Sequence, residues 1–439
     1  MDDEYRPESP REVTAPCATG CWQTRIVVTA DDVDAAAARL GDVATVTPLQ
    51  RSERLSALCD ANVLLKREDL QPVRSYKLRG AHNFLVQLPA ERRAHGVVCA
   101  SAGNHGQGVA LAGARLGVRS RVYLPRTTPR QKRERIAALG GGTVEVCLVG
   151  DTYDEAAAAA QQHVAETGAT FLPAFNDSAI IAGQGTVARE VVTQLGAAPD
   201  MLVVPVGGGG LLAGTVAWTE SRAPATHVVG VEPAGAASMT AALAEGRPVP
   251  LEHLDGFVDG AAVRQVGDMT LSHVAASRAE LVTVGEGRLC SELLALYQTE
   301  GIIAEPAGAL ATAVLGDALT PARGSTVVCV VSGGNNDVSR YAEILERSLV
   351  YEGLKHYFLV AFPQEPGALR RFLDEVLGPD DDITRFEYVK RNNREYGPAL
   401  VGVELARPED LGGLLSRIEA SSLDVEQLQP GTPLYAFVS

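Results

Sequence analysis

The sequence has 439 residues, 46% of them hydrophobic, so it is long enough for two or three domains with buried cores. Its formal net charge of -15 argues against a nucleic-acid partner, because binding to phosphates requires basic patches. Seven scattered cysteines favour reduced thiols in a cytoplasmic protein over a disulfide framework or a zinc site.

Residues 1–24 are charged, contain prolines and lack an apolar core, which predicts a tail rather than an export signal. The uncharged stretch 201–219 approaches the length of a membrane span. Pro205 and four consecutive glycines would break a helix in the bilayer, so we expect a buried strand, loop and helix there and no contact with a membrane.

Apolar runs typical of strands alternate with helical patterns between about residues 60 and 350. The expected strands cover residues 97–101, 120–124, 143–148, 170–172, 201–206, 227–232 and 326–331. The expected helices include residues 153–166, 179–195 and 287–299. This alternation predicts an α/β fold with parallel twisted sheets that helices cover on both faces.

The pattern changes after Arg347, where a second domain is expected. Its elements should be a strand, a helix, two strands, a helix and a last strand, at residues 355–362, 366–377, 383–390, 399–405, 410–420 and 434–438. That order predicts a small α/β sandwich.

Lys77 lies in the motif Ser75-Tyr76-Lys77-Leu78 and is one of only five lysines in the chain. Arginine supplies the other basic residues, so a retained lysine suggests a task that guanidinium cannot perform. A desolvated amine can lose its proton and form a Schiff base, whereas guanidinium stays protonated. Taken alone, a lysine beside a tyrosine is most often a solvated side chain.

Three other segments place a polar or glycine-rich turn between an expected strand and an expected helix, at residues 101–108 (SAGNHGQG), 206–211 (VGGGGL) and 330–336 (VVSGGNN). Free N–H groups at a helix start bind anions, and glycines let a phosphate approach the backbone. A hydroxyl at a strand end can hydrogen-bond a ring nitrogen. Each segment alone also fits an ordinary turn, and Ser332 or Asn336 also fits a helix N-cap.

The four-glycine run has two alternative interpretations. A nucleoside-triphosphate loop is excluded, because no Lys-Ser or Lys-Thr pair follows the glycines. A dinucleotide site fits the spacing of Gly208, Gly210 and Ala213, with Glu232 about 20 residues further on. A dehydrogenase of that kind would leave Lys77 and Ser332 without roles.

An amine, an asparagine, a phosphate cradle and a hydroxyl together outline a pocket for pyridoxal phosphate. Their order over residues 25–345 resembles the fold-type II pyridoxal phosphate enzymes, specifically the threonine ammonia-lyases (threonine dehydratases). The resemblance implies that Lys77 is the catalytic Schiff-base lysine, that Asn104 contacts the phenolic oxygen of the cofactor, and that Ser332 faces its pyridine nitrogen. The phosphate would be held by Gly207, Gly208, Gly209, Gly210 and Leu211.

The same resemblance implies that Ser101, Gly103 and His105 surround the substrate carboxylate. Glu305 would lie near the cofactor ring, although a carboxylate at a helix start is an alternative interpretation. Residues 66–72, which also resemble the family, are interpreted as structural. A smaller lobe at about 66–165 would carry Asn104, and a larger lobe would carry the glycine run and Ser332.

The implied reaction is β-elimination of L-threonine to 2-oxobutanoate and ammonia, with L-serine giving pyruvate, as the first step of isoleucine biosynthesis. Residues 355–439 resemble the ACT-like regulatory domain of biosynthetic threonine ammonia-lyases in a single copy, after a linker at 346–354. Glu365, Pro366 and Gly367 would border the effector, unless they form only a capped turn. Isoleucine is the expected effector, valine is a second candidate, and a homotetramer is the expected assembly.

Three other functions remain open at this stage. A serine racemase or a catabolic serine/threonine dehydratase shares the motifs, but the carboxyl-terminal domain speaks against both. A sensor that keeps an inert fold is least compatible with the intact Lys77.

Residues 233–238 lack the acidic residue of relatives that bind a divalent metal, so no metal site is expected, although a monovalent ion stays possible.

Overall fold

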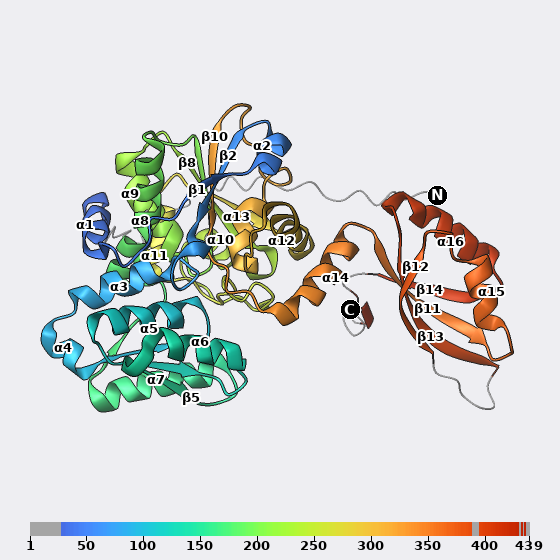
Figure 1. The fold of residues 1–439 in the computed structure, drawn as a ribbon, viewed down its shortest axis with the longest axis horizontal. Coiled ribbons are helices and arrows are strands. Elements are labelled where there is room, and N and C mark those ends of the chain that lie inside the picture. The colour runs from blue at the N-terminus through green and yellow to red at the C-terminus, as the bar shows by residue number, and fades with distance from the viewer. Residues whose placement is uncertain (1–27, 389–394, 430–431, 433, 436–439) are drawn as a thin grey trace. The chain divides into compact units, whose positions relative to one another are not determined.

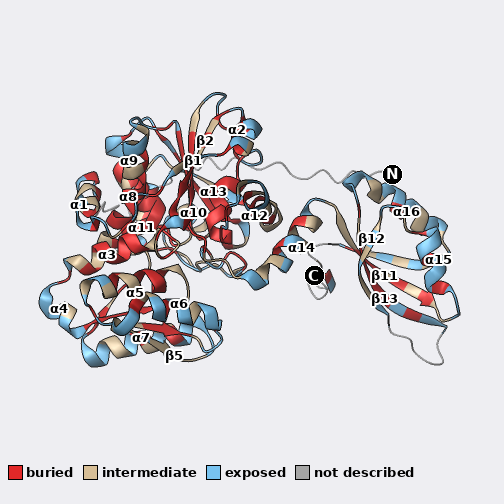
Figure 2. Cartoon of the chain, viewed as in Figure 1, coloured by how far each residue is buried: buried red, intermediate tan, exposed pale blue. Residues whose placement is uncertain are grey.

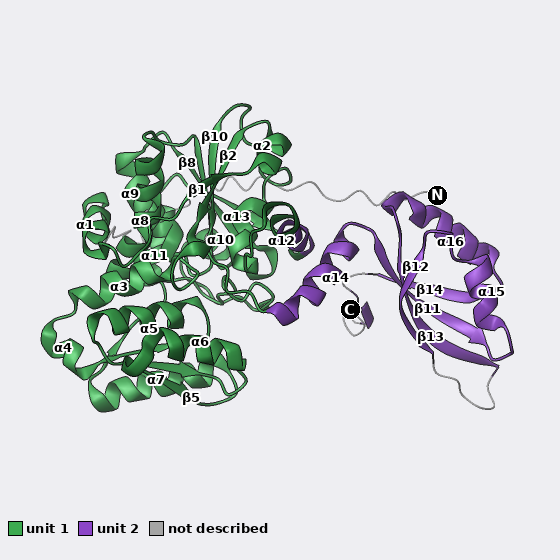
Figure 3. Ribbon diagram, viewed as in Figure 1, with its two compact units in different colours: residues 1–286, 295–337 green, residues 287–294, 338–439 purple. Residues whose placement is uncertain are grey.

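The computed structural model describes residues 28–388, 395–429, 432, 434 and 435, so the expected tail at 1–24 lies outside the described residues. The chain divides into two compact units (Figure 3). The first unit comprises residues 1–286 and 295–337, and the second comprises residues 287–294 and 338–439. Each unit is described by itself below.

The larger sheet of the first unit has the strand order β1-β2-β10-β7-β8-β9. These strands are β1 (Leu49–Arg51), β2 (Asn62–Arg67), β10 (Thr326–Val331), β7 (Met201–Pro205), β8 (His227–Pro233) and β9 (Glu280–Val284). All neighbouring pairs are parallel except β1 with β2. The loops that follow β2, β10 and β7 therefore leave the sheet at the same edge.

The smaller sheet of the first unit is entirely parallel and has the order β5-β4-β3-β6. Its strands are β3 (Val97–Ala100), β4 (Ser120–Leu124), β5 (Val144–Leu148) and β6 (Thr170–Phe171). Every residue of β3 is buried, as is every residue of β7, and such continuous apolar strands are typical of parallel sheets with two covered faces.

Helices cover these two sheets, and the residues that face the sheets are buried (Figures 1 and 2). They are α1 (Ala30–Leu40), α2 (Glu53–Cys59), α3 (Lys77–Gln87), α4 (Ala90–His95), α5 (Asn104–Leu116), α6 (Arg130–Gly140), α7 (Tyr153–Thr167), α8 (Ser178–Leu195), α9 (Gly210–Arg222), α10 (Ser238–Glu245), α11 (Asp268–Ala275), α12 (Glu286–Glu300) and α13 (Pro306–Ala313). Residues 287–294 of α12 belong to the second unit. No helix in the described part of the chain is long and apolar enough to span a membrane.

The second unit contains one antiparallel sheet with the order β12-β13-β11-β14. Its elements are α14 (Tyr341–Tyr351), β11 (Lys355–Pro363), α15 (Ala368–Glu375), β12 (Asp382–Tyr388), β13 (Tyr396–Glu404), α16 (Leu411–Ala420) and β14 (Asp424–Leu428). Phe358, Phe362 and Val401 of the sheet share a core with Phe372 of α15 and Leu414 of α16. The predicted fold class, parallel α/β sheets followed by a small α/β sandwich, is confirmed.

The predicted last strand at 434–438 is wrong. The strand is β14, Asp424–Leu428, which pairs with β11 at the edge of the sheet. Leu434 and Tyr435 are not in a strand, and residues 436–438 lie outside the described residues. Tyr435 instead packs on Tyr357, with ring centres 5.8 Å apart.

Candidate active site

Backbone pairing brings the segment before Lys77 beside the loop that follows β10. The N–H of Tyr76 donates to the carbonyl of Ser332 at 3.2 Å, and Ser75 forms an antiparallel bridge with Gly333. Lys77 begins α3 directly afterwards. Two predicted site residues, Lys77 and Ser332, therefore come together although they are far apart in the sequence.

Lys77 is half-buried, and its amine has few protein contacts. Its Nζ donates to the carbonyl of Ala174 at 3.2 Å and lies 5.3 Å from the centre of the Tyr76 ring. The hydroxyl of Ser75, two residues earlier, is fully buried and has no hydrogen-bond partner among the described residues. An unpaired buried hydroxyl is destabilising by about 1–3 kcal/mol, so it suits a site that a bound molecule completes.

The glycine loop between β7 and α9 has no space for side chains. A Cβ on Gly208 would lie 2.3 Å from the Phe175 ring, and Gly209 has a φ of +87°, which disfavours other residues. No side chain caps α9, so its first N–H groups have no partner within the helix and are open to an anion. Thr270 fixes the loop by donating to the carbonyl of Gly208 at 2.8 Å.

Ser332 lies at the carboxyl end of the central strand β10 and is only 3% exposed. Its hydroxyl donates to the carbonyl of Ala307 at 3.2 Å. Because the O–H bond can rotate, the same proton can be redirected to a ring nitrogen placed next to it.

The turn at the start of α5 contains Ser101, Gly103 and His105. Ser101 Oγ accepts a hydrogen bond from the Gly103 N–H at 3.3 Å, and no side chain caps the helix. His105 Nε2 lies 3.0 Å from the carbonyl of Leu172, which can only accept, so Nε2 carries a proton. Burial, assisted by the charge of Lys77, lowers the pKa of His105 to about 4. His105 is therefore neutral and offers no positive charge, which leaves the backbone N–H groups of this turn to bind an anion.

Glu305 precedes α13 as its N-cap residue but does not cap that helix with its side chain. Its carboxylate instead accepts a hydrogen bond from Asn104 Nδ2 at 2.5 Å. Asn335 Nδ2 donates to Asn104 Oδ1 at 2.7 Å. The sequence drew attention to Glu305 but not to Asn335, although the SGGNN motif contains it.

Glu232, which fits a dinucleotide site in the sequence, has a structural role here. It is fully buried, and both carboxylate oxygens accept hydrogen bonds from the start of α10. The donors are the N–H of Met239 at 2.7 Å and the N–H and hydroxyl of Thr240 at 2.9 and 2.6 Å. These contacts hold it away from any role as a ribose ligand.

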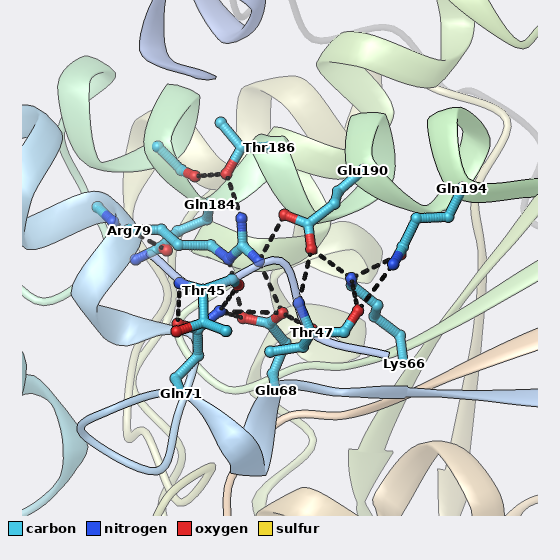
Figure 4. A network of polar contacts seen from close by, with 12 residues as sticks. Thr45, Thr47, Lys66, Glu68, Gln71, Arg79, Gln184, Thr186, Glu190 and Gln194 are labelled. Atoms are coloured by element: carbon cyan, nitrogen blue, oxygen red, sulfur yellow. Dashed lines mark hydrogen bonds and ion pairs between the residues drawn. The ribbon is translucent and has the colours of Figure 1, made fainter. Parts of the chain in front are cut away.

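A buried network of charged groups surrounds Arg79 of α3 (Figure 4). Arg79 forms two parallel hydrogen bonds with Glu68, both at 2.8 Å, and contacts Glu190 at 2.9 Å. Lys66 pairs with Glu190 and donates to the carbonyl of Thr47 at 2.7 Å. In this network two cations pair with two anions, which is consistent with a structural role for residues 66–72.

In the second unit, Gly367 directly precedes α15 with a φ of +88°. Glu365, Pro366 and Gly367 are exposed, and Glu365 pairs with Arg371 on the first turns of α15. In the part of the chain that the structure describes, no group of three or more His, Cys, Asp or Glu side chains is placed to hold a metal ion.

Comparison with known proteins identifies the family. Residues 41–333 match the pyridoxal-phosphate dependent enzymes, and residues 346–438 match the C-terminal regulatory domain of threonine dehydratase. The chain is 61% identical over 410 residues to the biosynthetic L-threonine dehydratase IlvA of Mycobacterium tuberculosis (strain ATCC 25618 / H37Rv), covering 93% of this chain and 95% of that protein. The chain belongs to the biosynthetic L-threonine dehydratase family.

Other similarities agree with this assignment. The corresponding IlvA of Corynebacterium glutamicum is 54% identical over 418 residues, which cover 94% of this chain and 96% of that protein. Among solved structures, the processed threonine deaminase isoform 2 of Solanum lycopersicum gives a TM-score of 0.68 at 36% identity, covering 75% of this chain and 99% of that one. Maize serine racemase gives a TM-score of 0.67 at 27% identity, covering 74% and 98%.

Pyridoxal phosphate is the cofactor of this family, and the residues of this chain fit it. The side-chain-free loop at Gly208 and Gly209 suits a phosphate, the unpartnered Ser75 hydroxyl lies two residues before the amine of Lys77, and Ser332 lies beside them. Membership of a dehydratase family with a regulatory domain also implies an amino-acid substrate and an effector.

Proposed function

We propose that this chain converts L-threonine to 2-oxobutanoate and ammonia, and L-serine to pyruvate and ammonia, as the first step of isoleucine biosynthesis. Water lost in the β-elimination is taken up again when the released imine hydrolyses. The observation that carries this proposal is the pairing of the Lys77 segment with the Ser332 loop at the sheet edge where the glycine loop also leaves β7. The name of the relative that is 61% identical supports the choice of threonine.

In this proposal each site residue has one task. Bound pyridoxal phosphate supplies an aldehyde that takes up the amino group and a ring that accepts electron density from the α-carbon. Lys77 holds the cofactor at rest and takes the α-proton on Nζ once its amine is free. The glycine loop with Leu211 binds the phosphate, and the Ser101–Gly103 turn binds the substrate carboxylate through backbone N–H groups. A serine beside the ring nitrogen, in place of a carboxylate, leaves the ring closer to neutral and a weaker acceptor of electrons.

The reaction can be tested by measuring 2-oxo acid and ammonia from each substrate. We expect L-threonine to give 2-oxobutanoate and ammonia in equal amounts. The ratio of kcat/KM for L-threonine to that for L-serine should be roughly 10–200 at most. The two substrates differ by one methyl group, and a hydrophobic pocket discriminates only weakly between such substrates. Formation of D-serine without any 2-oxo acid would instead support the racemase alternative.

We further propose that residues 355–439 bind isoleucine, with valine as a second effector, after a catalytic domain at 25–345 and a linker at 346–354. The match of residues 346–438 to a threonine dehydratase regulatory domain supports a regulatory domain in this part of the chain, although the match already begins at residue 346. A homotetramer is the proposed assembly, because coupling between subunits amplifies effector binding. A cytoplasmic location is proposed because the described cysteines form no disulfide with one another.

Replacing Gly367 by valine should weaken inhibition by isoleucine. Gly367 has a φ of +88°, and a β-branched residue there is strained by about 1–3 kcal/mol, so the turn should move away from the effector. We expect the isoleucine concentration for half-inhibition to rise about tenfold, because 1.4 kcal/mol is a factor of ten. The matched control is Gly353→Val, at a glycine with φ +70° just before the other end of β11. Equal effects of both variants, or unchanged inhibition in Gly367→Val, would place the effector elsewhere.

A further inference from the structure

A series of hydrogen bonds joins four segments around the proposed cofactor site. Asn335 Nδ2, after β10, donates to the carbonyl of Val73 at 2.8 Å and to Asn104 Oδ1 at 2.7 Å. Asn104 Nδ2, at the start of α5, donates to Glu305 Oε1 at 2.5 Å. The series therefore links Val73, Asn335, Asn104 and Glu305 in that order.

The hydrogen bond between Asn335 and Val73 fixes the donor and the acceptor of every other bond in this series. A backbone carbonyl can only accept, so the atom of Asn335 that faces Val73 must be the amide nitrogen. The second N–H of Asn335 then points to the oxygen of Asn104. The amide nitrogen of Asn104 must therefore lie on the opposite side, where one of its two N–H bonds goes to Glu305.

We propose that Asn335 and Glu305 are positioning residues that orient the Asn104 amide, so that its second N–H bond is presented to the phenolic oxygen of the cofactor. This inference rests on the proposed function and on the family resemblance, which implies that Asn104 contacts that oxygen. Within the described residues Glu305 is the one acceptor of the Asn104 amide nitrogen, so the second N–H bond is available to a ligand.

Glu305 is held rigidly enough to serve this purpose. It is 5% exposed, and its backbone N–H donates to the carbonyl of Gly333 at 3.1 Å. A Cβ on Gly333 would lie only 2.1 Å from Glu305 Oε1, so the loop that carries Ser332 closes directly over the carboxylate. The close approach of Gly333 therefore limits the room on one side of the carboxylate.

The surroundings of Glu305 make the contact sensitive to pH. Burial, and after it the nearby charge of Asp259, raise the pKa of Glu305 to about 7. The hydrogen bond from Asn104 and the charges of Lys132 on α6 and Lys77 on α3 oppose that rise. Above this pKa the carboxylate accepts strongly from Asn104; below it the neutral acid is a weaker acceptor. The hydrogen bond from Asn104 to the phenolic oxygen should therefore change in strength near neutral pH.

The decisive measurement is the visible absorbance of the bound cofactor in the holoenzyme, titrated over about two pH units around the Glu305 pKa. Wild type should show a transition near pH 7. Glu305→Gln, which keeps an acceptor oxygen but cannot ionise, should bind the cofactor and show no transition. Asp259→Asn removes a like charge from the surroundings of Glu305, so its midpoint should move to lower pH.

A second pair of variants tests the direction of this series of hydrogen bonds. Asn335→Asp replaces both donors by acceptors, so Asn104 should turn its nitrogen toward residue 335 and its oxygen toward the cofactor. We expect the dissociation constant of the cofactor to rise by roughly tenfold or more. The control is Asn62→Asp, at the start of β2, which should leave cofactor affinity unchanged.

These outcomes separate the inference from the proposed function. A transition that persists in Glu305→Gln, or an Asn335→Asp variant with native cofactor affinity, overturns the positioning role while the function stands. A protein that carries no cofactor on Lys77 would overturn the proposed function itself.

Discussion

Replacement of Lys77 by arginine is expected to lower the turnover of threonine by a factor on the order of 10⁴. Arginine keeps the positive charge and most of the bulk, but guanidinium neither bonds to an aldehyde nor gives up its proton. The loss would therefore report the amine chemistry and not the charge. Release of 2-oxobutanoate under single-turnover conditions measures this loss directly.

The covalent link provides an independent measurement. After reduction with borohydride and digestion, the wild-type peptide that contains residue 77 should carry the mass of the cofactor. Lys132→Arg is the matched control, because Lys132 is ion-paired with Asp259 at 3.1 Å and arginine preserves that charge. Native turnover in Lys77→Arg, or an adduct on a different lysine, would refute the role of Lys77.

Replacement of Glu68 by glutamine should destabilise the first unit by about 3–5 kcal/mol, the usual effect of breaking a buried ion pair by removing one partner. Glu68 is fully buried and accepts two hydrogen bonds from Arg79, which is itself buried. Glutamine keeps the shape but leaves the guanidinium with less opposing charge. The free energy of unfolding in urea measures the effect, and Glu134→Gln in the exposed Arg130–Glu134 pair should show no comparable loss.

The pH dependence of stability offers a further check on Glu68. Burial alone would raise the pKa of Glu68, but the charges of Arg79 and Lys66 outweigh it and hold the pKa below its ordinary value of 4.5. A carboxyl with a depressed pKa stabilises the fold above the unfolded value, and this contribution is lost as the pH falls through the folded value. Wild type should therefore lose more stability in acid than Glu68→Gln does. Identical acid profiles would show that Glu68 is not ionised in the folded protein.

Much of the fold could be predicted because burial in parallel sheets leaves a strong pattern. The limits of β4 and β10 agree with the sequence, since each is a short apolar run that ends at a turn. The prediction of the last strand failed for a physical reason. β14 lies at a sheet edge and has charged residues at alternate positions, which hides a strand in the sequence, whereas the more apolar composition of residues 434–438 suggests one.

The candidate site was predictable in part, because several of its residues sit in loops with unusual composition. Lys77, the four glycines and Ser332 each interrupt an apolar pattern with a residue type suited to one task. The partners of Asn104 and Arg79 could not be predicted in the same way. Glu190 reads as an ordinary surface charge on α8, and only the packing of α8 against α3 brings it to Arg79. The contact between Asn335 and Asn104 likewise depends on tertiary structure alone.

The position of β10 in the sheet constrains when the first unit can fold during synthesis on the ribosome. The smaller sheet is complete in sequence by Phe171, whereas β10 is the last strand of the larger sheet to be synthesised and yet lies between β2 and β7. Until residue 331 emerges, β2 and β7 lack their shared neighbour, and unpaired strand edges promote aggregation. A nascent chain that stalls shortly before Thr326 should therefore present two open edges, and it should depend on chaperones more than a chain that stalls just after Val331.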